Sequence, residues 1–292
     1  MVAYLGLLTT DDVALHGRDV DTAALVDALR GDGLRVDAPV WHDESVDWGA
    51  YDLLVIRSPW DYSERFAEFM AWLDRAAGLT RILNAPELIR WNIDKKYLRD
   101  LEGHGLPCVP TVFCETVEEA EVAVSRSGQD RIVVKPSISA GSRDTGLFAP
   151  GDPEAIELAG RILAAGKTVM VQPANEHVIE HGENGLFFLN GTYAYAFHKG
   201  PILAPGGVYV GGEYGPAITA TEATPAEIAL GERALEAVRK SGFDLPLYAR
   251  IDIAAGTEVI EVEVFEPAYQ SDTVPEAVGL VAQAIRDRIR GL

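Results

Sequence analysis

The stretch that decides the fold reads LYARIDIA at positions 247–254 and EVIEVEV at positions 258–264. We predict that these are two adjacent strands, joined as a hairpin by the intervening Ala-Gly-Thr. Successive side chains of a strand point to opposite faces, so Glu261 and Glu263 share one face. The hairpin brings Asp252 close to both. The pattern therefore predicts three carboxylates on one face of a sheet.

Three carboxylates so close together repel one another unless a cation lies between them. Hard oxygen ligands of this kind suit Mg²⁺, which typically takes one or two carboxylates together with substrate phosphates. Arg250 lies two residues before Asp252 and shares its face. It is either the salt-bridge partner of the acids or a group that holds an anionic substrate. A solvent-facing strand of an acidic protein gives the same pattern, and the residues alone leave that alternative open.

The composition narrows the classes of function. The chain has 292 residues, enough for two or three small lobes, with 48% hydrophobic and 24% charged residues. A net charge of −20 argues against nucleic acid and against anionic membranes as partners. We expect no membrane span and no signal peptide. Cys108 and Cys114 are expected to pack as thiols in a reducing cytoplasm.

The first ninety residues show an α/β pattern. We predict strands and helices at Ala3–Leu8 (strand), Thr22–Arg30 (helix), Arg35–Pro39 (strand), Asp52–Ile56 (strand) and Phe66–Ala76 (helix). Helices between parallel strands give a doubly wound sheet. The third strand is followed by Arg57-Ser-Pro-Trp-Asp-Tyr62. Because ligands of such sheets bind at the carboxyl ends of strands, this loop either contacts a ligand or only turns and packs.

A second unit follows. The stretch Trp91–Leu98 is expected to open a helix that carries Lys95, and a lysine there can equally be an ordinary surface residue. The apolar strand Arg131–Lys135 runs into a small, polar loop at residues 136–146, which includes Ser139 and Gly141. Such a loop can lay backbone N–H groups on phosphate oxygens.

The remaining pattern is a strand, a hairpin, a glycine-rich stretch and two helices. The predicted ranges are Thr168–Gln172 (strand), Leu186–Leu189 and Thr192–Phe197 (hairpin), Pro225–Ser241 (helix) and Val274–Arg290 (helix). Asn190-Gly191 is a strong hairpin signal, and Lys199 extends the second strand. Residues 206–215 are rich in glycine and are expected to form a loop over a site.

The order of these features resembles the ATP-grasp superfamily over nearly the whole chain. The resemblance is carried by the N-terminal α/β pattern, the Val-Val-Lys-Pro strand, the small-residue loop, the Val-Gln-Pro strand end and the acidic hairpin. It implies a doubly wound N-terminal α/β lobe and two α+β lobes that enclose ATP. The implied lobes are residues 1–92, 93–172 and 173–292.

The resemblance also implies nucleotide-binding residues. Lys95 and Lys135 look like the lysines that hold the phosphates, with Ser139 and Gly141 in the phosphate loop. The residues that look like the adenine-binding hinge are Gln172, Pro173 and Ala174. The acid that binds the ribose is Glu176, Glu180 or Glu183, and Glu183 is favoured.

Asp252, Glu261 and Glu263 resemble the ligands of one or two Mg²⁺ ions. The commonest pattern of the superfamily has Asn where Glu263 stands. The extra charge should tighten metal binding unless Glu263 is protonated or paired with Arg250. The candidate catalytic residues are Arg250 at an acyl phosphate, Arg57 holding the substrate, and Lys199. Cations placed where a transferring phosphoryl group gathers charge supply most of such catalysis.

Several stretches, among them Arg-Ser-Pro-Trp-Asp-Tyr and Glu-Val-Phe-Glu-Pro, resemble a narrower group that includes the O-ureido-serine cyclo-ligase of D-cycloserine biosynthesis. That resemblance implies that ATP activates the carboxylate of O-ureido-D-serine and that ring closure follows. The alternatives are an intermolecular carboxylate–amine ligase and a nucleotide-binding regulatory module without turnover. The expected partner is a small amino-acid-like substrate, and a homodimer is the default assembly.

Overall fold

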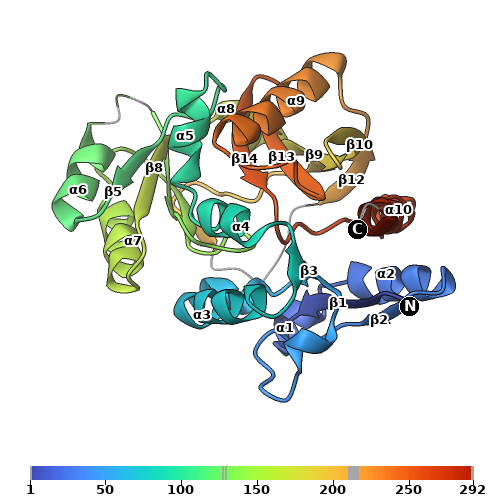
Figure 1. Ribbon diagram of the computed structural model, residues 1–292. Coiled ribbons are helices and arrows are strands. Elements are labelled where there is room, and N and C mark those ends of the chain that lie inside the picture. Colours follow the sequence, from blue (N-terminus) through green and yellow to red (C-terminus); the bar gives the residue numbers. More distant parts are fainter. Residues whose placement is uncertain (1, 127, 129, 210–216, 291–292) are drawn as a thin grey trace.

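The computed structural model describes residues 2–126, 128, 130–209 and 217–290. Within these ranges the strands form three sheets, one of four strands and two of five (Figure 1). The four-stranded sheet belongs to the N-terminal part of the chain. The two five-stranded sheets follow it, and the predicted combination of α/β and α+β lobes is confirmed.

The N-terminal sheet is parallel throughout, with the strand order β2-β1-β3-β4. Its strands are β1 (Tyr4–Thr9), β2 (Arg35–Asp37), β3 (Leu53–Ser58) and β4 (Arg81–Leu83). Leu5, Leu7 and Val55 lie in the core shared with helix α2 (Asp21–Gly31). Leu54 and Ile56 point to the other core, which contains helix α3 (Phe66–Ala77). Helices therefore cover both faces, as a doubly wound sheet requires.

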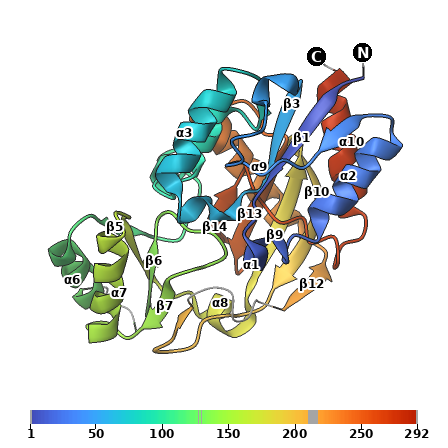
Figure 2. The same ribbon diagram turned by 90° about the horizontal axis from the view of Figure 1, so that it is seen from below.

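One cover of this sheet comes from the opposite end of the chain. Helix α10 (Ala277–Arg290) lies beside α2 in both ribbon views (Figures 1 and 2). Val281 and Ile285 of α10 belong to the same buried cluster as Leu25 and Leu29 of α2. The last helix thus completes the core of the first sheet.

The second sheet is antiparallel and has the order β11-β7-β6-β8-β5. Its strands are β5 (Val112–Cys114), β6 (Ile132–Pro136), β7 (Thr145–Phe148), β8 (Val169–Pro173) and β11 (Val208–Tyr209). Helices α6 (Val117–Ser125) and α7 (Pro153–Ala164) pack on it in one buried cluster. Asp152 caps α7 by accepting from the Glu154 N–H, and Pro153 occupies its first turn, where its missing N–H costs nothing.

The third sheet carries the acidic hairpin. Its order is β12-β10-β9-β13-β14, and all of its pairings are antiparallel. Its strands are β9 (Glu183–Leu189), β10 (Thr192–Lys199), β12 (Ile218–Thr221), β13 (Tyr248–Ala254) and β14 (Glu258–Glu263). Helix α9 (Pro225–Lys240) packs with Phe188 and Ile251 on one face, and Phe187 lies in the core shared with α10 on the other.

Short elements connect these layers. They are α1 (Val13–His16), η1 (Trp48–Ala50), η2 (Trp60–Ser63), α4 (Pro86–Asn92), α5 (Tyr97–Gly103) and α8 (Glu176–His181). The helix expected to open within Trp91–Leu98 is α5, which begins only at Tyr97; because α4 ends at Asn92, Lys95 lies in the turn between the two helices and not in a helix. Strands β4, β7, β11 and β12 and helix α8 were not predicted.

The glycine-rich stretch is only partly described. Gly206 and Gly207 lead into β11, whereas Gly211, Gly212 and Gly215 lie outside the described residues. Among the described helices, none is both long and apolar enough to cross a membrane.

Candidate active site

The site is built on the hairpin of β13 and β14. Asp252 pairs with Glu261 across the hairpin, and Arg250 pairs with Glu263. Ala255 and Gly256 both have left-handed backbone conformations, with φ of 50° and 70°, which suits a tight hairpin turn. The hairpin predicted from the sequence is therefore present. Directly paired residues lie close on one face, so the register gathers three acids and one arginine.

The linker between the first two lobes holds the open edge of β14. Asn92 Nδ2 donates to the Val262 carbonyl at 2.7 Å, and the Val264 N–H donates to Asn92 Oδ1 at 3.2 Å. The Val262 N–H donates to the Tyr97 hydroxyl at 2.8 Å. Asn84 Nδ2 donates to the Val264 carbonyl. These side chains satisfy the edge strand that carries the acids and fix it in place.

Lys95 lies in the turn between Asn92 and Tyr97 and points at the hairpin. Its Nζ is 3.1 Å from Glu261 Oε1 and donates to the Ser139 carbonyl at 3.2 Å. Its backbone N–H donates to the Ser137 carbonyl at 3.0 Å. Burial opposes the charged form of Lys95, but the Glu261 carboxylate raises its pKa. Lys95 thus joins the small-residue loop to the acidic hairpin.

Asp252 is enclosed by two cations. Arg250 binds it through Nε at 2.8 Å and Nη2 at 2.9 Å, a two-pronged pair of charge-assisted bonds. Lys199 Nζ lies 2.7 Å from Asp252 Oδ2 and 2.5 Å from Glu183 Oε1. Burial favours the neutral acid, but Arg250 and Lys199 lower the pKa of Asp252 to about 2. Asp252 is therefore ionised at neutral pH.

Lys135 ends strand β6 and adds a further cation to the site. Burial lowers its pKa, and the positive charge of Lys95 acts in the same direction. The carboxylates of Glu261 and Glu183 oppose that shift. Burial disfavours the charged ammonium of Lys135. Lys135 and Lys95 together are therefore suited to bind an anion such as phosphate.

Glu266 is a further acid of the site that the sequence pattern did not single out. It is 4% exposed, and its Oε1 accepts from the Tyr62 hydroxyl at 2.9 Å. Burial and the neighbouring Glu263 carboxylate raise the pKa of Glu266 well above its usual range. The only sequence signal was the stretch Glu-Val-Phe-Glu-Pro, which served the resemblance as a whole.

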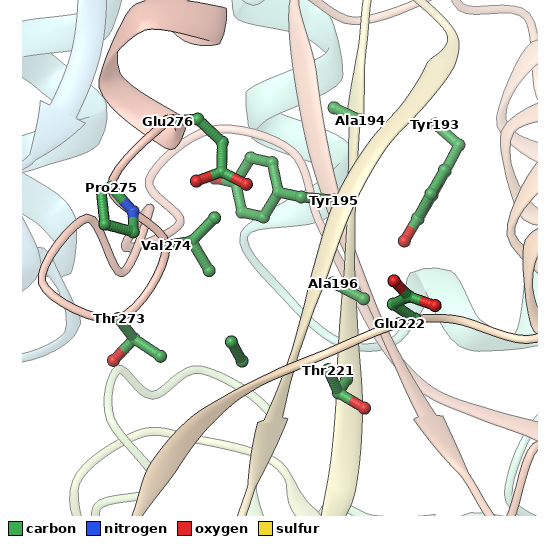
Figure 3. A pocket seen from close by; sticks show the side chains of 11 residues that line it. Tyr193, Ala194, Tyr195, Ala196, Thr221, Glu222, Thr273, Val274, Pro275 and Glu276 are labelled. Atoms are coloured by element: carbon green, nitrogen blue, oxygen red, sulfur yellow. The ribbon is translucent and has the colours of Figure 1, made fainter.

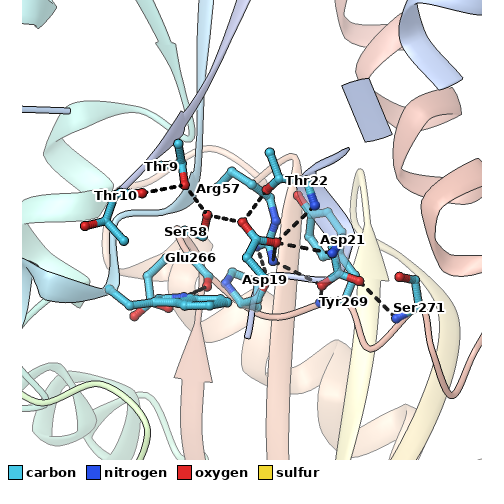
Figure 4. A network of polar contacts seen from close by, with 12 residues as sticks. Thr9, Thr10, Asp19, Asp21, Thr22, Arg57, Ser58, Glu266, Tyr269 and Ser271 are labelled. Atoms are coloured by element: carbon cyan, nitrogen blue, oxygen red, sulfur yellow. Dashed lines mark hydrogen bonds and ion pairs between the residues drawn. The ribbon is translucent and has the colours of Figure 1, made fainter. Parts of the chain in front are cut away.

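The structure places Arg57 apart from these cations. Its side chain is fully buried, where it donates to the Pro267 carbonyl at 2.6 Å and to Asp21 at 3.1 Å (Figure 4). Asp19 lies 3.6 Å from the same guanidinium. With zero exposure, Arg57 has no surface with which to hold a substrate in this conformation. The expectation that Arg57 holds the substrate does not fit this conformation, because partners far away along the chain bury its side chain.

The predicted hinge residues Gln172 and Pro173 lie at the end of strand β8, and Ala174 follows it. Gln172 is buried and donates through Nε2 to the Thr111 hydroxyl at 2.7 Å, and Pro173 pairs with Ile132. The Ala174 N–H already donates to the Arg131 carbonyl at 3.0 Å. In the small-residue loop, Gly141 has a φ of 61°, a conformation that favours glycine.

The three candidate ribose acids have different surroundings. Glu176 forms an ion pair with Arg131, and Glu180 lies 3.7 Å from His181 on the exposed face of α8. Glu183 lies at the start of β9 and binds Lys199. The structure therefore brings Glu183 into the charged site and holds Glu176 elsewhere.

The carboxylates of the hairpin do not form a complete Mg²⁺ site by themselves. Across the described ranges, no three His, Cys, Asp or Glu side chains are arranged to hold a metal ion by themselves. Asp252 and Glu261 are instead paired with Lys199, Arg250 and Lys95. Mg²⁺ is usually bound by one or two carboxylates together with substrate phosphates, so a complete protein cage is not required. Ionised oxygen ligands on adjacent strands fit that mode of binding.

A separate pocket of about 590 Å³ lies beside strands β10 and β12 of the third sheet (Figure 3). It is lined by β10, β12 and the segment before α10, including Tyr193, Glu222 and Glu276. None of the predicted site residues lines it. The charged site around the hairpin therefore does not depend on this pocket.

Solved structures share this architecture. A RimK domain protein ATP-grasp from Sphaerobacter thermophilus DSM 20745 matches with a TM-score of 0.65 and 18% identity, covering 97% of this chain and 99% of the other. The D-alanine–D-alanine ligase from Bacillus anthracis complexed with ATP matches with a TM-score of 0.69 and 12% identity over the whole of both chains. These matches show that the chain has the ATP-grasp fold.

Nearer relatives specify the family. Residues 5–84 match the family model of the D-cycloserine synthetase DcsG N-terminal domain. The cycloserine biosynthesis protein DcsG of Streptomyces lavendulae is 35% identical over 300 residues, covering 97% of this chain and 98% of the relative. The crystal structure of D-cycloserine synthetase DcsG matches with a TM-score of 0.89 and 32% identity, covering 98% and 99% of the two chains. The chain belongs to the DcsG family.

Proposed function

We propose that this ligase uses ATP to close the ring of D-cycloserine. The carboxylate of O-ureido-D-serine attacks the γ-phosphorus of ATP, giving an acyl phosphate and ADP. The alkoxy-urea nitrogen of the same molecule then attacks the activated carbonyl, and phosphate leaves. Water cleaves the bond between the ring nitrogen and the carbamoyl carbon, so that the carbamoyl group leaves as carbamate, which decomposes to CO2 and ammonia. The relation to DcsG supports the substrate, and the arrangement of Arg250, Asp252 and Glu261 supports the chemistry.

The observation that carries the proposal is the placement of Arg250. Its guanidinium is held by Asp252 and by an ion pair with Glu263, while its side chain remains 13% exposed. Burial opposes ionisation, but Asp252 and Glu263 raise the pKa of Arg250, so it stays charged. We assign it to the negative charge that develops at the acyl phosphate, where a fixed cation lowers the barrier.

Lys95 and Lys135 are proposed to hold the ATP phosphates. Lys95 is already tied to the small-residue loop through the Ser139 carbonyl, and Lys135 lies at the strand end that leads into that loop. Ser139 and Gly141 contribute the flexible backbone of the loop. Lys199 has side-chain exposure of 16% and is proposed to steady Asp252 and to add positive charge beside the phosphates.

The proposed ligands of one or two Mg²⁺ ions are Asp252, Glu261 and Glu263. A bound Mg²⁺ would neutralise phosphate charge and orient the γ-phosphoryl group. The protein residues fix this arrangement beforehand, because the hairpin register and the linker side chains determine where the carboxylates lie.

We propose that the hinge Gln172–Ala174 receives adenine through backbone groups other than the Ala174 N–H, which already has an acceptor. Glu183 is proposed as the ribose ligand, because it lies in the charged site beside Lys199. If it binds ribose, its ion pair with Lys199 must loosen when ATP enters.

Measuring both ADP release and product mass tests the proposed reaction. Wild-type enzyme is incubated with ATP, Mg²⁺ and O-ureido-D-serine, and cycloserine is expected together with ADP. The L-enantiomer and a set of amino acids with a separate amine are run in parallel. ADP release that requires a separate amine would replace ring closure with intermolecular ligation. ADP release with none of these carboxylates would point to a nucleotide-binding module without turnover.

The proposed setting is the cytoplasm, with a small amino-acid-like substrate as partner. Cys108 and Cys114 are both free and buried, which supports a reducing compartment. The lobe boundaries at residues 92 and 172 and the homodimer remain predictions. Size-exclusion chromatography with light scattering tests the dimer.

A further inference from the structure

The segment that follows strand β14 forms hydrogen bonds with side chains of the N-terminal lobe. Residues 266–271 run across the carboxyl ends of the N-terminal strands, where they meet Asp21, Arg57, Trp60 and Tyr62 (Figure 4). We call these four residues the N-lobe clamp. The hydrogen bonds of the N-lobe clamp join regions that are far apart in the sequence.

Asp21 forms the inner part of the clamp. Its Oδ2 accepts from the Tyr269 N–H at 2.7 Å, and its Oδ1 accepts from the Ser271 N–H at 3.0 Å. Gln270 lies between them with a φ of 60°, a left-handed conformation that is uncommon for a residue with a side chain. Such a backbone turn makes a concave nest of N–H groups that binds anions. Here the anion is the Asp21 carboxylate, whose side chain is 2% exposed.

Arg57 braces this nest. Its Nη2 donates to Asp21 Oδ2 at 3.1 Å, and its Nη1 donates to the Pro267 carbonyl at 2.6 Å. The guanidinium carbon lies 4.1 Å from the centre of the Tyr269 ring. The buried carboxylate and the buried guanidinium thus compensate each other while both bind the same segment.

Trp60 and Tyr62 connect the N-lobe clamp to the proposed catalytic residues. Trp60 Nε1 donates to the Glu266 carbonyl at 3.0 Å, and the Tyr62 hydroxyl donates to the Glu266 carboxyl at 2.9 Å. Glu266 lies three residues after Glu263, the last residue of β14, and Glu263 forms an ion pair with Arg250. The clamp therefore ends one side chain away from the proposed metal ligand.

We propose that Asp21 is a positioning residue of the ligase: by filling the nest at Tyr269–Ser271 it fixes the segment that holds Glu266 against Glu263. Asp21 touches neither ATP nor substrate in this scheme. Its effect on the reaction passes through Glu266 to Glu263 and Arg250. This inference rests on the proposed function only in the tests that measure turnover. The hydrogen-exchange test does not depend on turnover.

Backbone hydrogen exchange tests the nest directly. Asp21→Asn leaves a single acceptor oxygen for two N–H groups, so exchange in the peptide containing Tyr269 and Ser271 should speed up at least about tenfold. Asp27→Asn is the matched control, because Asp27 is exposed on the same helix. Equal protection in wild type and Asp21→Asn would overturn the assignment of the nest, whatever reaction the enzyme catalyses.

Steady-state kinetics test the positioning role. Asp21→Asn should lower kcat for ADP release at least about tenfold, raise the Mg²⁺ concentration needed for half-maximal rate, and leave the KM for ATP within about twofold. A residue that only stabilises the fold would leave kcat unchanged at temperatures where both proteins are folded, and that result would overturn the proposal. Asp27→Asn should match wild type.

Tyr62→Phe keeps the test decisive if Asp21→Asn does not fold. It removes a single hydroxyl from Glu266 and preserves the packed ring. We expect kcat to fall about threefold to tenfold with the same pattern in Mg²⁺ and ATP, and an unchanged kcat would overturn the proposal. If wild-type enzyme releases no ADP with any substrate, the proposed function fails, and the exchange experiment still decides the nest.

Discussion

Asp252 lies directly opposite Glu261 in the hairpin, and each of the two acids is bound by a different lysine. Lys199 comes from strand β10, which β9 separates from the hairpin, and Lys95 comes from the turn between α4 and α5. The paired acids are thus the point at which two parts of the chain meet. Removing either charge should disturb catalysis before it disturbs folding.

Glu261→Gln should lower ADP release at saturating Mg²⁺ by about 100-fold or more, because it removes a ligand charge beside the phosphates. Lys95 retains its bond to the Ser139 carbonyl, so the melting temperature should change by only a few degrees. Glu258→Gln, at the start of the same strand, is the control and should behave as wild type. Full activity of Glu261→Gln would remove Glu261 from the proposed metal ligands.

Lys135→Ala should weaken binding of a non-hydrolysable ATP analogue by about 10-fold to 100-fold, the usual range for losing a bond to a charged group. Isothermal titration calorimetry measures the affinity, and thermal melting checks the fold. Lys240→Ala, at the exposed end of α9, is the matched control. An affinity equal to that of the control would make Lys135 a buried structural lysine.

Arg250→Lys should lower kcat much more than it raises the KM for ATP, because the lost interaction grows in the transition state. A lysine cannot reproduce the two-pronged bond to Asp252 and the contact with Glu263 together. We expect a loss in kcat of about 100-fold. Arg239→Lys, in an exposed pair with Glu236, is the control. A rise in the KM for ATP with an unchanged kcat would show instead that Arg250 contributes to ground-state binding.

Arg57→Met should cost about 3–5 kcal/mol in the free energy of unfolding, because it leaves Asp19 and Asp21 as uncompensated buried charges. Urea denaturation followed by fluorescence measures this loss. The KM for substrate should respond only through the general loss of structure. A large rise in substrate KM with unchanged stability would instead show that Arg57 reaches the substrate by a change of conformation.

Asp19 should make stability depend on acid pH. Burial favours its neutral form, but Arg57 and the hydrogen bonds from Ser58 and Thr22 lower its pKa below the ordinary value of 3.8. An acid with a lowered folded-state pKa stabilises the protein above its unfolded-state pKa and loses that contribution as the pH falls through the folded-state pKa.

The stability difference between wild type and Asp19→Asn should therefore be largest near neutral pH and should shrink below about pH 4. Urea denaturation at a series of pH values measures that difference. A difference that stays constant down to pH 2.5 would show that the Asp19 charge contributes nothing through its pKa.

Elements with a regular local pattern were predictable from the sequence. The acidic hairpin follows from the alternation of apolar and acidic residues along its two strands. The Asn190-Gly191 hairpin, with φ of 49° and 85° at these residues, follows from turn chemistry. In each case the residues that determine the structure lie close together in the sequence.

Features that depend on distant partners were not predictable. Trp91–Leu98 has a helical pattern, yet Asn92 ends α4 and uses its amide to hold β14. Arg57 was expected in a loop after the third strand, yet it belongs to β3 and is buried by partners far away along the chain. Glu266 belongs to the site through Tyr62, and that contact exists only once the lobes have assembled.

The packing of α10 on α2 sets an order of events during synthesis. The ribosome releases Leu25 and Leu29 long before it releases Val281 and Ile285, which share their buried cluster. Until α10 emerges, the nascent first lobe keeps an apolar face exposed to solvent and to chaperones. Although domains of nascent chains generally fold from the N-terminus onward, this lobe completes its core only after α10 has left the ribosome.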